Sequence, residues 1–246
     1  MSVWKNVWWL TKQDIKMVRY GGYIWSLLYY LNAMFVLFVF MKPEVSMEGG
    51  VNGFLTVVFN LFVLSVIQVV GYPIDTRNMN YWKNDAYTKR IMQLKMLPVT
   101  NKEIVTSRFL VYILYSSFFI LLLHVGIRVM MSLQWLEPVG WGTWLGMIFF
   151  WWGTVLAVGS FYLYGEMSMK GKAFFRFSLL MLLATLIFSI LLWWTGNYMV
   201  WPLVISSVER YGVTVPACSV IIGATALGIS WKILGRKIGH RDLFAS

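Results

Sequence analysis

Long apolar stretches separated by short polar segments dominate the chain from residue 21 onward. Six of these stretches hold about 20 mostly apolar residues each, enough for a helix to cross the roughly 30 Å hydrocarbon core of a bilayer. They cover residues 21–41, 51–73, 109–131, 140–164, 174–194 and 213–234. The pattern therefore predicts an all-α polytopic membrane protein with six transmembrane helices in a single transmembrane domain.

Lysines and arginines collect in alternate connections, next to the ends of the spans. They are Lys5, Lys12, Lys16 and Arg19 before span one, Arg77, Lys83, Lys89, Arg90, Lys95, Lys102 and Arg108 between spans two and three, Lys170, Lys172 and Arg176 between spans four and five, and Lys232, Arg236, Lys237 and Arg241 after span six. The other side of the membrane receives Lys42, Arg128 and Arg210. Since basic residues near span ends mark the cytoplasmic side, both termini are predicted to be cytoplasmic.

The segment before the first span has the pattern of an amphipathic helix. Its four basic residues share one face at helical spacing, and the opposite face carries Trp4, Val7, Trp8, Ile15 and Val18. Such a helix lies in the membrane interface. A simple anchor and a mechanical role both remain open for it.

The domain organisation follows from these features. Residues 1–20 form the interfacial elbow helix, 21–73 spans one and two, 74–108 a cytoplasmic loop, 109–234 spans three to six, and 235–246 a cytoplasmic tail. The outward connections, 42–50, 132–137 and 202–212, are short, so we expect function within the membrane or at its cytoplasmic face.

Composition supports the membrane assignment and narrows the function classes. Hydrophobic residues make up 59% of the chain and charged residues 13%, and the mean hydropathy is +0.67. The net charge of +11 lies beside membrane segments, where it attracts anionic lipid head groups, and no nucleic-acid-binding motif accompanies it.

Candidates for catalysis are few. His124 and His240 are the only histidines and Cys218 is the only cysteine, so neither a metal site nor a catalytic group is expected. The sequence near Gly165 and Lys172 misses the spacing of a phosphate-binding loop, so we expect no ATP site in this chain. The lack of carboxylates well inside a span argues against an ion-coupled carrier.

The cytoplasmic loop between spans two and three contains a short helix with one apolar face. Tyr87, Ile91 and Leu94 recur at helical spacing, with Lys89, Arg90 and Lys95 around them. Pro98 is expected to end this helix. Thr100 with Glu103 then forms a capping box that starts a helix continuous with span three.

Residues 85–108, DAYTKRIMQLKMLPVTNKEIVTSR, resemble the corresponding loop of type-2 permeases of bacterial ATP-binding-cassette (ABC) exporters. The resemblance implies a coupling helix at about residues 87–97 and a separate ATPase subunit that holds ATP and Mg²⁺. It also implies a second copy of this permease or a related one, and a location in the bacterial cytoplasmic membrane. The residues expected at the ATPase contact are Tyr87, Arg90, Ile91, Leu94, Lys95, Leu97 and Pro98. Ile91→Asp with Leu94→Asp is accordingly expected to abolish ATPase association while leaving membrane insertion intact.

Polar side chains share one face on two of the spans. They are Thr56, Asn60 and Gln68 on span two, and Ser178, Thr185 and Ser189 on span five. The resemblance places these two spans near a dimer axis, so the six residues are candidates for a substrate path. The alternative is hydrogen bonding between packed helices, worth roughly 0.6–2 kcal/mol per bond. The spacing of Gly142 and Gly146 on span four predicts close backbone packing.

The resemblance also suggests a cargo, with amphipathic or antimicrobial-type peptides, such as phenol-soluble modulins, ranked first. Lipids or small hydrophobic drugs come next, and polysaccharide last. Two other functions remain open: a non-transporting membrane scaffold or sensor, and an ion-coupled carrier.

Overall fold

A computed structural model of the chain describes residues 3–18, 20–41, 53–72, 81–134, 136, 138–196 and 198–240. The elements in these ranges are α1 (Val3–Met17), α2 (Tyr20–Met41), α4 (Gly53–Val69), α6 (Tyr81–Asn84), α7 (Ala86–Lys95), α8 (Asn101–Ser132), α9 (Trp141–Ser168), α10 (Gly171–Gly196), α11 (Val200–Tyr211), α12 (Thr214–Lys237) and the 3-10 helix η1 (Ile238–His240). The predicted features at Arg19, Lys42, Arg77 and Arg241 and the connection 42–50 lie outside the described residues. The all-α prediction is confirmed for the part described.

Four of these helices, α8, α9, α10 and α12, are long and apolar enough to cross a membrane. They contain predicted spans three to six. The helix α4 is a shorter apolar helix within predicted span two, and α2 covers predicted span one. The chain is therefore a multi-pass membrane protein, and its six-span count stays a prediction.

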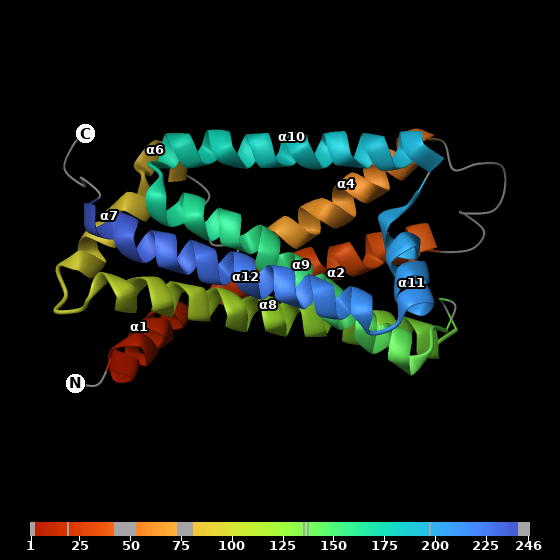
Figure 1. The fold of residues 1–246 in the computed structure, drawn as a ribbon, viewed down its shortest axis with the longest axis horizontal. Coiled ribbons are helices and arrows are strands. Elements are labelled where there is room, and N and C mark those ends of the chain that lie inside the picture. Colours follow the sequence, from red (N-terminus) through yellow and green to blue (C-terminus); the bar gives the residue numbers. More distant parts are fainter. Residues whose placement is uncertain are drawn as a thin grey trace.

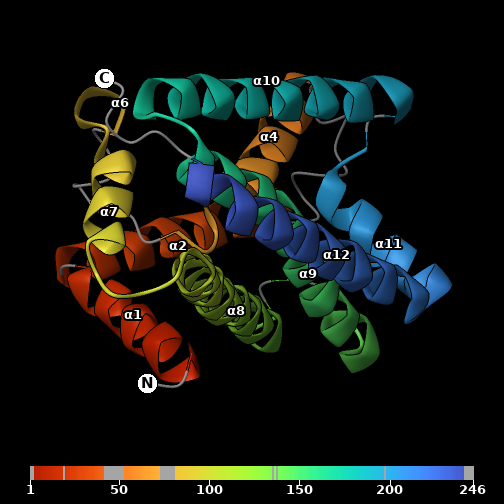
Figure 2. The same cartoon turned by 60° about the vertical axis from the view of Figure 1, so that its left-hand side comes forward.

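The helices form an elongated bundle with one helix set apart. Along the length of Figure 1, α8, α9 and α12 run side by side, and α10 lies above them with α4 crossing the space between. Figure 2 shows the same separation from another side. The first helix α1, α7 and the end of α12 share one end of the bundle, and α11 lies at the other.

Glycines set how closely α9 and α12 approach. A Cβ atom built at Gly153 would collide with the backbone of Ser219 and Val220, and one built at Gly223 with the backbone of Gly153. At Gly146 it would meet Val208 Cγ1 at 2.6 Å, whereas at Gly142 it would meet nothing within 4 Å. Close packing is thus confirmed at Gly146, whereas at Gly142 no neighbour from the described part of this chain approaches, and packing there stays a prediction.

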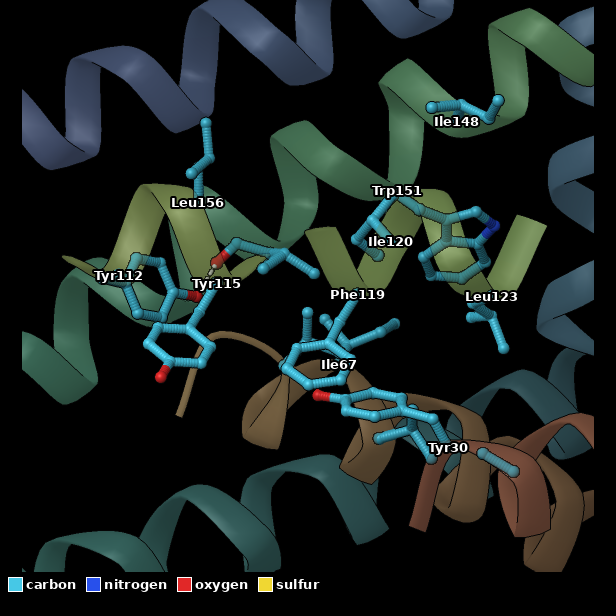
Figure 3. Close-up of a cluster of buried hydrophobic side chains, with 14 of the residues drawn as sticks. Tyr30, Ile67, Tyr112, Tyr115, Phe119, Ile120, Leu123, Ile148, Trp151 and Leu156 are labelled. Carbon is cyan, nitrogen blue, oxygen red and sulfur yellow. Dashed lines mark hydrogen bonds between the residues drawn. The ribbon is translucent and has the colours of Figure 1, made fainter. Parts of the chain in front are cut away.

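The core lies where α2, α4, α8 and α9 meet (Figure 3). Tyr30 stacks on Phe119 with ring centroids 4.2 Å apart, and the Tyr112 hydroxyl donates to the Val155 carbonyl over 2.8 Å. Trp151 stacks on Trp201 of α11 at 5.5 Å. These contacts join α2 to α8, α8 to α9, and α9 to α11.

The capping box at the start of α8 is confirmed. Glu103 N donates to Thr100 Oγ1 over 3.3 Å, and Thr100 N donates to Glu103 Oε2 over 2.6 Å. From this cap α8 runs unbroken to Ser132, as predicted. Glu103 Oε1 also accepts a hydrogen bond from Asn6 Nδ2 over 2.9 Å, which ties α1 to the first turn of α8.

One sequence expectation needs correction, and one stays open. Residues 202–212, expected to be a loop, belong largely to α11, because Val200, Val204 and Val208 recur one helical turn apart and are buried. On α1, Val7 is buried together with Leu10, whereas Trp4 is 71% exposed, and the interfacial placement of this helix stays a prediction. Packing against α8 takes up only a narrow strip of α1.

Candidate functional site

The helix α7 begins at a residue in an unusual backbone conformation. Asp85 has φ 44° and ψ 46°, in the left-handed region that aspartate tolerates better than most residues. Its Oδ1 atom accepts hydrogen bonds from Thr88 Oγ1 and from Gly171 N, both over 2.8 Å. One carboxylate therefore fixes the start of α7 to the start of α10.

The apolar face of α7 points into the molecule. Tyr87 and Ile91 are buried, and Leu94 is half-buried against the core. The ring of Tyr87 lies 5.4 Å from the rings of Tyr81 and Phe174. Burial raises the pKa of the Tyr87 hydroxyl above its ordinary value, and the negative charge of Glu166 adds to the rise, so Tyr87 stays neutral.

Two ion pairs lie beside this face. Arg90 of α7 pairs with the buried Asp14 of α1. Arg108 of α8 pairs with Glu166 of α9, its Nη2 atom lying 2.8 Å from Oε1 and 3.1 Å from Oε2. Arg108 and Glu166 are both buried.

These four charges line one small internal cavity together with Tyr87. We call this cluster of Asp14, Tyr87, Arg90, Arg108 and Glu166 the charged joint. It draws side chains from α1, α7, α8 and α9, and its two ion pairs join α1 to α7 and α8 to α9. Removing one partner of a buried pair costs about 3–5 kcal/mol because the other charge is left unpaired. This figure applies to Arg108 and Glu166, since the Arg90 side chain is 26% exposed.

The end of α7 is also attached. Lys95 Nζ donates to the Ile238 carbonyl at the end of α12 over 2.7 Å. Leu97 is half-buried and Pro98 is exposed in the turn that follows. The outward side of α7 therefore consists of Lys89, Gln93 and Met96, spaced four and three residues apart, with Met96 79% exposed.

The predicted ATPase-contact residues thus divide by position. Tyr87, Ile91 and Leu94 contact other parts of this chain, and Arg90 and Lys95 are engaged with Asp14 and Ile238. That these residues reach an ATPase stays a prediction, and Lys89, Gln93 and Met96 are exposed on the opposite side.

The polar residues on α4 and α10 lie partly together. Gln68 Nε2 donates to Thr185 Oγ1, and the Tyr162 hydroxyl donates to Gln68 Oε1 over 2.7 Å, so α4, α9 and α10 are joined. Asn60 is bound elsewhere: its Nδ2 donates to the Tyr198 carbonyl over 2.8 Å, and its Oδ1 accepts from Val200 N over 2.7 Å. Asn60 thereby holds the start of α11.

The other three candidates are turned toward the protein. Thr56 and Ser189 are fully buried, and the hydroxyl groups of Ser189 and Ser178 donate to the carbonyls of Thr185 and Phe174 in their own helix. Packing contacts thus account for these side chains as the structure stands. A role in a substrate path stays a prediction for all six residues.

Sequence reasoning missed the acidic members of the site. Asp14, Asp85 and Glu166 each face a partner from a distant part of the chain, and pairing across such separations leaves no local periodicity. The sequence did mark Glu166 as a candidate site residue, because this acidic residue stands at the end of an apolar span, four residues before Lys170. Among the described residues, no three of His, Cys, Asp and Glu lie together as metal ligands would.

Comparison with protein families gives one match. The family described as ABC-2 family transporter protein matches residues 10–236, most of the chain. Comparisons with curated proteins and with solved structures gave no match. The match includes most of α1, all of α7 and the charged joint. The chain therefore belongs to the ABC-2 transporter family, and this membership makes it a permease subunit of an ABC transporter, which works with an ATPase subunit.

Proposed function

We propose that the chain is the membrane subunit of an ATP-driven exporter and that a separate ATPase docks on α7. The observation that carries the proposal is the attachment of α7 on its inner sides, which leaves the stripe Lys89, Gln93 and Met96 outward. A cationic and apolar stripe on a rigidly held helix suits a protein partner that must apply force. ATP and Mg²⁺ would be held by that partner.

The attachments give a route for the force. Movement of α7 acts on α1 through Arg90 and Asp14, on α10 through Asp85, and on α12 through Lys95. The four helices would shift together at the cytoplasmic end, and the opposite end would respond because the spans are long and straight. This coupling would alternate inward and outward access. It requires both termini to lie in the cytoplasm of a bacterial cell, with the spans in the cytoplasmic membrane.

A second permease, identical or related, would complete the pathway. The helix α10 is mostly exposed along its length, with Leu180 64% and Trp194 77% exposed. Surfaces of this kind are covered by lipid or by another protein. Pairing of two copies through α10 and α4 would place Gln68 and Thr185 near the shared path.

For the cargo we propose amphipathic or antimicrobial-type peptides, with lipids or small hydrophobic drugs next and polysaccharide last. The support is the resemblance of residues 85–108 together with the apolar surface of α10, which suits a cargo with an apolar face. Export of such a peptide would be measured as ATP-dependent uptake into inside-out vesicles.

The two alternative functions, an ion-coupled carrier and a scaffold or sensor, differ from the proposal in what they require of this chain. An ion-coupled carrier needs a carboxylate that can take up and release its ion, whereas Glu166 is held by Arg108. A scaffold or sensor needs no ATPase. Copurification with a working ATPase therefore separates the proposal from both.

The test compares copurification of the ATPase between a variant with new acidic residues on α7 and a control variant with a charge reversal on α1. Lys89→Glu with Met96→Glu reverses the outward stripe of α7 without touching its buried face, and Lys12→Glu makes the same kind of change on exposed α1. The double variant is expected to lose copurified ATPase at least tenfold, and Lys12→Glu to keep it. Normal association in the double variant would overturn the docking site.

The sequence pattern predicts that Ile91→Asp with Leu94→Asp abolishes ATPase association. This double variant does not separate a loss of docking from a loss of folding. Ile91 is 4% exposed, so an aspartate there would place a charge in the core and disturb the whole cytoplasmic end.

A further inference from the structure

The end of the bundle opposite the charged joint carries an apolar groove of about 760 Å³. Its walls are the first turns of α9, the end of α11 and the first turns of α12, represented by Gly142, Phe149, Val213 and Ile221. The two turns from Gly142 to Phe149 give it a length of roughly 11 Å along the bundle. Grooves of roughly 300–1,000 Å³ hold a small organic ligand.

Glycine opens this groove. A side chain at Gly142 would meet nothing within 4 Å and would project into the free volume. Four residues deeper, Gly146 lets Val208 of α11 approach to form the floor. The four-residue spacing of Gly142 and Gly146 predicts close helix packing. Here it brings α11 close at Gly146 and leaves free volume at Gly142.

Among the described residues that line the groove, Glu209 alone is charged. It is exposed, and within the described part of the chain it makes no ion pair or side-chain hydrogen bond. Glu209 lies in the last turn of α11, whereas Phe149 and Ile221 line the groove from α9 and α12, about two turns from the starts of those helices. The groove thus pairs one negative charge with an apolar lining.

We propose that the groove binds a phospholipid whose head group carries an ammonium, such as phosphatidylethanolamine. The ammonium would pair with Glu209, and an acyl chain would lie along α9 and α12. Of the described residues none from α2, α4 or α10 lines the groove, so it opens sideways from the bundle. A bilayer lipid enters it without crossing the protein, which favours lipid over a transported peptide.

The experiment is photocrosslinking of the full chain in nanodiscs. Phosphatidylethanolamine and phosphatidylglycerol with the same photoactivatable acyl chain are compared, and crosslinks to residues 142–149 and 213–221 are quantified by mass spectrometry. Crosslinks to exposed residues of α10, such as Leu180, Leu183 and Ile187, serve as the reference for ordinary lipid contact. This local readout is needed because the basic cytoplasmic surface attracts phosphatidylglycerol elsewhere.

Phosphatidylethanolamine is expected to crosslink to the groove about two- to fivefold more than phosphatidylglycerol, the range of an exposed ion pair. Glu209→Gln should bring this ratio to that of the α10 reference. Gly142→Leu should reduce crosslinking of both lipids in the groove. Gly228→Leu, at another open glycine of α12, should change neither.

Two results would overturn the proposal. One is an equal ratio for the two lipids in the groove and on α10 of the native chain. The other is crosslinking that is unchanged by both Glu209→Gln and Gly142→Leu. If copies of the chain crosslink to each other through residues 142–149 and exclude both lipids, the groove is a protein contact, and the lipid site is likewise refuted.

Discussion

Glu166→Gln tests the charged joint most directly. The change keeps the size of the side chain but removes the negative charge that Arg108 contacts at 2.8 and 3.1 Å. Arg108 is 8% exposed, so its charge cannot be rehydrated without moving α8 or α9. Loss of one partner from a buried pair costs about 3–5 kcal/mol. Glutamine can still accept one hydrogen bond, so we expect about 3 kcal/mol.

The measurement is the apparent melting temperature of the purified chain in mild detergent. For a chain of this length 1 kcal/mol corresponds to roughly 2–4 °C, so Glu166→Gln should melt about 6–12 °C lower. Arg108→Met with Glu166→Leu removes both charges and should recover most of the loss, because apolar pairs often replace buried ion pairs without penalty. Glu209→Gln, at an exposed carboxylate, should melt like the native chain.

Two outcomes contradict this reasoning. If Glu166→Gln melts within about 1 °C of the native chain, the pair is solvated and the joint is not a buried unit. If the double variant melts as low as the single variant, the loss comes from packing around Glu166 and not from an unpaired Arg108.

Three further changes test other contacts by the same melting assay. Gly153→Ala should destabilise the protein by about 1–3 kcal/mol, because the backbone of Ser219 cannot move aside, whereas Gly142→Ala should be nearly neutral. Asn60→Leu should cost about 1–3 kcal/mol by leaving the start of α11 without its hydrogen bonds, and a change in cargo preference with no loss of stability would instead assign Asn60 to the path. Thr100→Ala should cost about 1 kcal/mol through loss of the capping box, and unaltered melting would show that the cap is redundant.

Spans three to six and the capped start of α8 could be predicted because they depend on local sequence. Span three was predicted to continue a helix that begins after Thr100, and α8 does so. The limits of α9, α10 and α12 fall within a few residues of the apolar stretches, since hydrophobic length decides them. The helix α11 was missed because it is too short to cross a membrane, although its four-residue apolar spacing was visible.

The orientation of α7 could not be predicted in the same way. The pattern of Tyr87, Ile91 and Leu94 shows that one face is apolar, but it does not say whether that face meets this chain or a partner. Phe174, which contacts Tyr87, is far away in the sequence. Likewise, Gln68 and Thr185 were recognised as polar positions in spans, whereas their hydrogen bond to each other depends on how α4 crosses α10.

The sparse burial of α10 has a practical consequence for anyone handling the protein. Little of this helix is covered by the rest of the chain: it contacts α4 along its length, and its first turns are held by α6, α7 and α9, through the bond from Gly171 to Asp85 and the ring contacts of Phe174. The position of α10 therefore depends on the lipid or detergent around it. In a purified sample this is the detergent or lipid chosen for the preparation. Harsh detergents should release α10 before the rest of the bundle unfolds, so lipid nanodiscs are the appropriate medium for functional work.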